Sequence, residues 1–164
     1  MCNCEKEKTT IRQFFVVKDE FRKNKEGVII LPKRATKCSA GYDFFLPNDV
    51  TIFPQESVLI WTDIKVRMEE DVVFEIVPRS SFGIKKSLML KNTIGKIDSD
   101  YFENESNDGN IGICLYNYGI EKQELKAGDA FCQGTFFKYY ITHDDSVQNE
   151  RVGGIGSTSK KENK

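Results

Sequence analysis

The chain has 164 residues, with 24 Lys and Arg against 25 Asp and Glu, so its formal net charge is −1. This length suits a single domain, and no apolar run approaches the roughly 18 residues of a membrane-spanning helix. The balanced charge argues against stable nucleic-acid binding, and the single histidine, His143, argues against Ser-His-Asp catalysis. The polar start, residues 1–6, lacks the apolar core of a signal peptide, which predicts a cytoplasmic location.

The apolar segments are short, rich in β-branched and aromatic residues, and separated by turn signals. The charged stretch 18–26 is the only plausible helix near the N-terminus. From Ile64 onward apolar and charged residues alternate, which predicts a half-exposed strand. This spacing predicts an all-β sandwich or barrel, with residues 1–149 as one β domain. Strands are expected at 12–17, 27–32, 42–46, 50–53, 57–68, 72–77, 88–90, 110–116 and 130–142.

The five cysteines are odd in number and follow no disulfide framework. Cys2 and Cys4 have no second pair to complete a tetrahedral zinc site. Cys114 and Cys132 stand inside apolar runs, so we expect both to be small buried hydrophobes.

Two segments carry groups suited to a phosphate. In 39–43 a glycine precedes a strand that carries Asp43, although a plain β-turn is the favoured interpretation of this segment taken alone. In 78–83 a proline ends a strand and is followed by Arg79, Ser80 and Ser81. A guanidinium, two hydroxyls and backbone N–H groups form a phosphate cradle, and one of the serines is also expected to cap a helix.

Two further segments carry acids or an amide. Segment 92–101 places Asp98, Asp100 and Tyr101 at the end of a strand, where two carboxylates on one side can flank a water or a metal. Solvated aspartates at a hairpin tip are the alternative. Segment 127–134 is a tight turn into a strand that offers Gln133 as an amide donor, and a plain hairpin turn is its alternative.

The tail, 150–164, has almost no apolar content, so we expect a flexible glycine-rich arm that orders only against another surface. Its stretch 151–158 combines an arginine, three glycines and two hydroxyls, which could wrap a polyphosphate. The pattern of a P-loop, G-x-x-x-x-G-K-[ST], is absent.

In sequence order, these blocks resemble the five motifs of the trimeric dUTPase family, from residue 40 to residue 158. The blocks are AGYD (40–43), PRSS with Gly83 (78–83), NTIGKIDSDY (92–101), GD…Q (128–133) and R…GGIGST (151–158). The resemblance implies a distorted jelly-roll or β-sandwich-like barrel that forms a homotrimer, with the arm exchanged between subunits. The inserted stretch 103–110 resembles enzymes of Firmicutes and their phages.

The resemblance implies hydrolysis of dUTP to dUMP and pyrophosphate, which limits uracil in DNA and supplies dUMP for thymidylate synthesis. Asp98 matches the general base that activates a water toward the α-phosphorus, and Asp100 matches a supporting neighbour. Tyr101 matches the ring that packs on deoxyribose and excludes a 2′-hydroxyl. The positions that match uracil recognition, largely through backbone groups, are Asn92, Gly95, Ile97 and Gly112.

The remaining motifs match the phosphates and the metal. Asp43 matches the residue that supports the phosphate site and a hydrated Mg²⁺, which the family holds through phosphate oxygens and water, without a direct protein ligand. The positions that match phosphate contacts are Arg79, Ser80, Ser81 and Gln133. In the arm, Arg151, Ser157 and Thr158 match γ-phosphate contacts. Gly156 follows Ile155, which replaces the usual aromatic and can cover uracil without stacking on it.

Two alternatives stay open. The related dCTP deaminases share the fold but need a glutamate on the strand after the third motif, and Gly112–Asn117 holds no acid. A phage-borne signalling or regulator-binding protein of this fold could use the inserted loop, 102–110. A longer solvated hairpin is the simpler interpretation of that loop.

Overall fold

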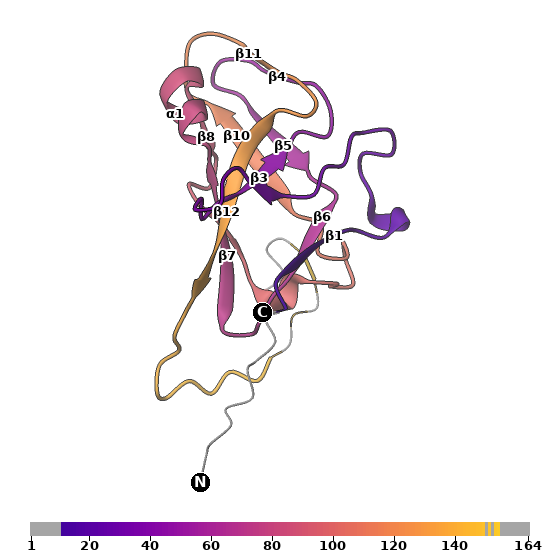
Figure 1. The fold of residues 1–164 in the computed structure, drawn as a ribbon, viewed down its shortest axis with the longest axis vertical. Helices are drawn as coiled ribbons and strands as arrows, with labels where there is room; N and C mark the ends of the chain where they lie inside the picture. Colours follow the sequence, from indigo (N-terminus) through magenta and orange to yellow (C-terminus); the bar gives the residue numbers. More distant parts are fainter. Residues whose placement is uncertain (1–10, 150, 152, 155–164) are drawn as a thin grey trace, which may run out of the picture.

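The computed structural model describes residues 11–149, 151 and 153–154. It is built almost entirely of strands (Figure 1), which confirms the expected all-β class. The strands are β1 (Gln13–Val16), β2 (Lys33–Arg34), β3 (Tyr42–Phe45), β4 (Val50–Ile52), β5 (Ser57–Trp61), β6 (Ile64–Arg67), β7 (Val72–Pro78), β8 (Leu88–Leu90), β9 (Gly95–Ile97), β10 (Gly112–Asn117), β11 (Gln123–Leu125) and β12 (Ala130–Lys138). The helices are η1 (Asp19–Phe21), α1 (Ser80–Lys86) and η2 (Ser99–Tyr101). Within the described residues, no helix has the length and apolar character needed to cross a membrane.

The strands form one large antiparallel sheet and three smaller pieces that close around a single core. The five-stranded sheet has the order β2-β3-β12-β7-β9, and the three-stranded sheet has the order β5-β10-β8. Side chains alternate between buried and half-buried along β10, as expected for a strand with one face on a core. Phe74 of β7 packs against Phe14 and Phe136 with ring centroids 5.4 and 4.6 Å apart. These aromatic contacts tie β1 to the large sheet.

The expected strand over 57–68 is two strands, because Thr62 and Asp63 turn the chain between β5 and β6. Asp63 adopts a positive φ of 56° and is fully buried. The prediction that this strand is half-exposed from Ile64 onward is wrong at Lys65, which is buried like its apolar neighbours, and is confirmed at Arg67, which is exposed.

Three other expectations at the level of elements need correction. The charged stretch 18–26 forms only the short η1, and 27–32 is not a strand. The expected serine cap of α1 is wrong, because the N-cap position is Arg79 and no side chain caps the helix. Cys132 is buried as expected, whereas Cys114 is only half-buried.

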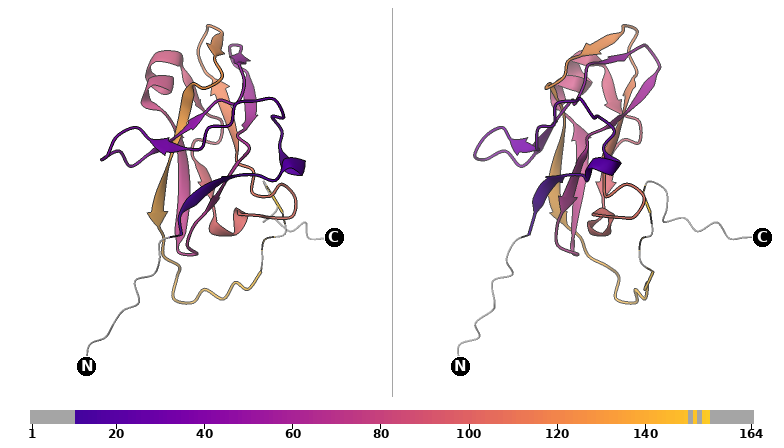
Figure 2. Two further views of the ribbon diagram at one scale, coloured as in Figure 1. Left: turned by 45° about the vertical axis from the view of Figure 1, so that its right-hand side comes forward. Right: turned by 90° about the vertical axis from the view of Figure 1, so that its right-hand side faces the viewer.

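Strand β7 determines where the motif segments lie. Its C-terminal end leads into α1, whereas β9 pairs antiparallel with the middle of β7, Ile97 opposite Phe74 and Gly95 opposite Ile76. In Figure 1, α1 lies at the upper end of the molecule and the segment with η2 at the lower end. After β12 the chain runs below the sheets and returns towards this lower end (Figures 1 and 2).

Candidate active site

One polar cluster lies where β3, β12 and the end of β7 meet. Asp43 of β3 is directly opposite Gln133 of β12, so both side chains lie on the same face of the sheet. The Nε atom of Arg79 lies 3.4 Å from Asp43 Oδ1, and its Nη1 donates a hydrogen bond to the carbonyl of Ala130. A methyl group on Gly41 would collide with Gln133 Oε1. The glycine therefore gives the Gln133 amide the space that it occupies beside Asp43.

Ser80 and Ser81 begin α1 directly after Arg79. Ser80 is exposed and Ser81 half-buried. The buried ring of Phe82 anchors this turn to the core. The backbone N–H of Phe82 donates to the carbonyl of Arg79. At this end of β7 the structure thus brings together the residues outside the arm that the sequence predicts for the phosphate site, namely Asp43, Arg79, Ser80, Ser81 and Gln133.

A cavity of about 360 Å³ lies alongside β9 and the start of β10. Its lining includes every position matched to uracil, namely Asn92, Gly95, Ile97 and Gly112, together with apolar side chains such as Leu59 and Leu90. A Cβ on Gly112 would lie 3.1 Å from the Trp61 ring and 3.2 Å from Leu59, so the glycine keeps this wall free of a side chain. A flat, mostly apolar ligand with a polar edge suits such a cavity.

The two predicted acids follow β9 directly. Asp98 and Asp100 are both more than half exposed, and both accept hydrogen bonds from Arg151. Arg151 Nη2 lies 2.6 Å from Asp98 Oδ2, and Nε lies 2.7 Å from Asp100 Oδ1. The same guanidinium lies over the Tyr101 ring, 5.6 Å from its centroid. The structure therefore joins the third motif to Arg151, the single arginine of the arm.

Tyr101 is buried and its hydroxyl is fully engaged. Its Oη donates to the carbonyl of Asn110 at 3.0 Å and accepts from Asn107 Nδ2 at 2.7 Å. Burial raises the pKa of the phenol, while the hydrogen bond from Asn107 and the charge of Arg151 act in the opposite direction. The ring is therefore neutral and fixed in orientation at physiological pH.

The interpretation of the inserted loop, 102–110, as a solvated hairpin is wrong. Asn104, Asn107, Asp108 and Asn110 are all buried. The asparagine amides form hydrogen bonds with one another and with the loop backbone. For example, Asn104 Nδ2 donates to Asn107 Oδ1 at 2.7 Å. Buried polar groups need such partners, and here the loop supplies most of them itself.

Sequence matches and a solved structure identify the family of this chain. Residues 28–159 match the sequence profile of dUTPase. The deoxyuridine 5′-triphosphate nucleotidohydrolase of Lactococcus lactis is 38% identical over 150 residues, which cover 90% of this chain and 97% of that protein. The chain belongs to the dUTPase family.

Two further proteins support this membership. The deoxyuridine 5′-triphosphate nucleotidohydrolase of Escherichia phage T5 is 36% identical over 144 residues, covering 80% of this chain and 93% of that protein. The crystal structure of the Streptococcus mutans dUTPase superposes with a TM-score of 0.69 at 32% identity, covering 79% of this chain and 97% of that one.

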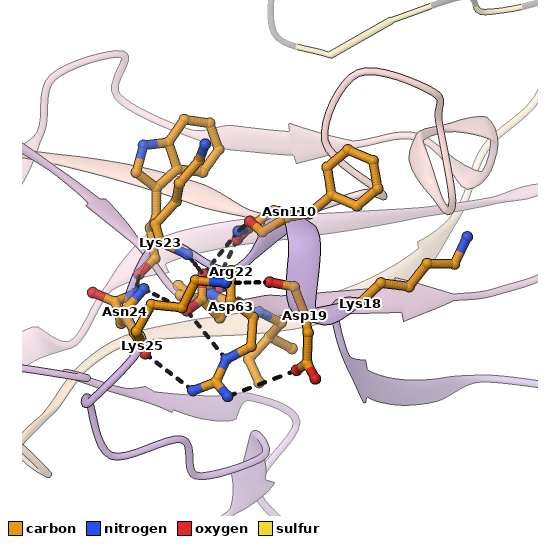
Figure 3. Close-up of polar contacts among 12 residues, drawn as sticks. Lys18, Asp19, Arg22, Lys23, Asn24, Lys25, Asp63 and Asn110 are labelled. Atoms are coloured by element: carbon orange, nitrogen blue, oxygen red, sulfur yellow. Dashed lines mark hydrogen bonds and ion pairs between the residues drawn. The ribbon is translucent and has the colours of Figure 1, made fainter.

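Sequence reasoning about this dUTPase missed the residues that hold its third motif in place. Asp63 Oδ atoms accept from the backbone N–H groups of Lys23 and Asn24 and from Asn110 Nδ2 at 2.8–2.9 Å (Figure 3). Asn110 Nδ2 also donates to the carbonyl of Phe21. The only signal for this role is an acid inside an otherwise apolar run at Asp63.

Lys65 is a second such residue. Its Nζ lies 2.9 Å from both Glu103 and Asp108 and 5.0 Å from the centroid of the Phe102 ring. Burial lowers the pKa of Lys65, but the hydrogen bonds and charges of Asp108 and Glu103 outweigh this and raise it. Lys65 thus fastens the inserted loop to β6 as a cation.

The other arm residues matched to the nucleotide, Ile155, Gly156, Ser157 and Thr158, lie outside the described residues.

Proposed function

We propose that this chain hydrolyses dUTP to dUMP and pyrophosphate, and that Asp98 is the base. One observation carries the proposal: the exposed Asp98 carboxylate directly follows β9, whose residues Gly95 and Ile97 line the cavity matched to uracil. The activity is the one named for the relatives in Lactococcus lactis and Escherichia phage T5.

Uracil recognition follows from the position of β9. This strand is at the edge of the five-stranded sheet, so one row of its backbone groups is not used by a neighbouring strand. Such an edge offers donors and acceptors to the O2, N3 and O4 atoms of uracil. The amino group of cytosine would place a donor against a donor, and an unpaired buried polar group is costly.

The chemical step needs a water between Asp98 and the α-phosphorus. Asp98 takes a proton as the water oxygen attacks phosphorus, and the bond to the bridging oxygen breaks with its electron pair leaving on pyrophosphate. Arg151 occupies Asp98 and Asp100 in this structure. In the proposed cycle it leaves the carboxylates for the γ-phosphate when the arm, 150–164, closes over the nucleotide.

The position of Arg79 supports assembly of the site from several copies of the chain. Ile97 pairs with Phe74, so Arg79 lies about 17–20 Å further along β7 than Asp98, at roughly 3.3 Å per residue. The cavity lies between the two, so a nucleotide with its base in the cavity and its α-phosphorus at Asp98 directs its phosphates away from Arg79 of the same chain. A homotrimer in which one subunit supplies Arg79 and another Asp98 resolves this separation.

Mg²⁺ fits this site as an ion held by the nucleotide. No group of three His, Cys, Asp or Glu side chains comes together in the part of the chain that the structure describes. Mg²⁺ commonly keeps waters and binds substrate phosphates, so we take phosphate oxygens and waters as its ligands here, with Asp43, which lies beside Arg79, as a partner of those waters. When bound, the ion would neutralise charge on the phosphates.

The test is a nucleotide assay on the purified chain with Mg²⁺. We expect dUTP to give dUMP and pyrophosphate in equal amounts, with UTP and dCTP nearly untouched. Release of ammonia from dCTP, or absence of pyrophosphate from dUTP, would overturn the proposal.

A further inference from the structure

Asn107 lies between two parts of the site that are far apart in sequence. On one side its Nδ2 donates to Tyr101 Oη at 2.7 Å and to the carbonyl of Asn110 at 3.3 Å. On the other side lies the arm, because a Cβ on Gly154 would be 3.1 Å from this same Nδ2 and 2.9 Å from Ser106 Oγ. One buried amide thus lies between the tyrosine of the third motif and Gly154 of the fifth.

The orientation of this amide is fixed. Asn107 Oδ1 accepts from Asn104 Nδ2 at 2.7 Å and from the N–H of Gly109 at 3.1 Å. With its oxygen engaged in this way, the nitrogen must point at Tyr101. A flipped amide would place an acceptor against the carbonyl of Asn110 and two donors against each other.

The platform below the amide is rigid as well. Asn110, whose carbonyl receives the Tyr101 hydroxyl, exchanges two hydrogen bonds with Asp63, at 3.0 and 2.9 Å. Asp108, next to Asn107, is held by Lys65 Nζ and by the backbone N–H of Lys18. The Asn107 side chain is therefore attached to β6 and the N-terminal segment through its neighbours on both sides.

We propose that Asn107 is a positioning residue that fixes the Tyr101 ring and seats the Gly153–Gly154 turn of the arm against it. Selection against a 2′-hydroxyl then depends on this amide, although Asn107 itself touches no substrate atom. The inference rests on the proposed function, since it concerns selectivity for dUTP.

The first experiment removes the Nδ2 donor, once with an acceptor oxygen kept and once without it. Asn107→Asp keeps the size and one acceptor oxygen, and Asn107→Leu keeps the size without adding charge. Both variants should lower kcat/KM for dUTP and reduce the preference for dUTP over UTP by roughly three- to tenfold, the effect of one hydrogen bond. Glu105→Gln, an exposed position of the same loop, is the matched control and should leave both unchanged.

A double-mutant cycle separates positioning from general damage. Tyr101→Phe removes the hydroxyl that Asn107 holds, so Asn107→Asp should change the dUTP/UTP preference much less in that background. Gly154→Ala should lower kcat/KM for dUTP in the parent chain and have a smaller effect in a Ser106→Ala/Asn107→Ala background, which removes both side chains that a Cβ there would meet. Circular dichroism and thermal unfolding verify that each variant is folded.

The outcomes are distinguishable. A parent chain that does not hydrolyse dUTP overturns the proposed function. An active parent with folded Asn107 variants whose dUTP/UTP preference is unchanged overturns the role of Asn107 alone. Equal effects of Asn107→Asp with and without the Tyr101 hydroxyl would also overturn it, because the residue would then not act through that ring.

Discussion

The guanidinium of Arg151 and the carboxylate of Asp98 lie 2.6 Å apart, and the arginine side chain is 8% exposed while the aspartate is 59% exposed. The contact joins a residue near the C-terminus to one in the centre of the chain, and Asp100 completes it. An arginine that covers the proposed base has to leave before a water can be deprotonated. In the cycle that we propose, Arg151 therefore exchanges carboxylate oxygens for phosphate oxygens.

Asp98→Asn should abolish turnover and retain nucleotide binding. The amide cannot accept the proton of the attacking water, and loss of a general base costs about 10²–10⁴-fold in rate. Pyrophosphate release and equilibrium binding of a non-hydrolysable dUTP analogue measure the two effects. Asp100→Asn is the matched control, with a smaller loss of rate. An Asp98→Asn variant as active as the parent would place the base elsewhere.

Gly41→Ala should weaken binding of the triphosphate without unfolding the chain. The new methyl group collides with the end of the flexible Gln133 side chain, which can move. The substitution therefore displaces the Gln133 amide and leaves the packing of the core intact. We expect a raised KM for dUTP and a nearly unchanged melting temperature. Gln133→Ala should raise KM similarly. In the double variant, Gly41→Ala should raise KM little beyond the effect of Gln133→Ala alone. A fully additive double variant would contradict this reading.

Lys65→Met should destabilise the fold strongly, because it leaves the buried Asp108 without its main cation. Breaking such a pair costs about 3–5 kcal/mol. Lys138→Met, which removes an exposed ion pair with Asp71, is the control and should change stability little. Urea unfolding measures both. Equal effects of the two substitutions would show that Lys65 is not a buried anchor.

Stability should also fall at alkaline pH. The folded state raises the pKa of Lys65 above its ordinary 10.5, so its contribution is complete below about pH 10.5 and is lost as pH rises through the folded value. The raised pKa of Tyr101 acts in the same direction, from about pH 10 upward. Melting temperatures measured against pH should decline less steeply in Lys65→Met and in Tyr101→Phe. Parallel curves for all three proteins would contradict the assignment.

The local pattern of the sequence was enough to predict most of the longer strands, but not the break between β5 and β6, the missing strand at 27–32 or the short strands β2, β9 and β11. The strand at Val72–Pro78 ends at its proline, and Asn92, Gly95, Ile97 and Gly112 line one cavity as the family motifs imply. Burial of polar residues was not predictable in this way. Lys65 alternates with apolar neighbours like an exposed residue, and only Asp108 and Glu103, about 40 positions away, make its burial possible.

The same limit applies to the inserted loop. A run of Asn, Asp and Ser predicts solvent exposure, but Asn104, Asn107 and Asn110 satisfy one another and the backbone in the interior. The pairing of Arg151 with Asp98 is likewise non-local, since more than fifty residues separate the two. These contacts depend on the closed tertiary structure, which no window of sequence contains.

Mixing two inactive subunits tests most directly whether different copies of the chain complete the dUTP site. Arg79→Ala and Asp98→Asn chains are co-expressed, purified as a mixed oligomer and assayed with dUTP at a concentration well below KM. If one subunit supplies Arg79 and another Asp98, about a quarter of the interfaces in a random trimer carry both intact residues, and a corresponding share of the parent activity should return. Mixed oligomers that stay as inactive as either variant alone would contradict the account.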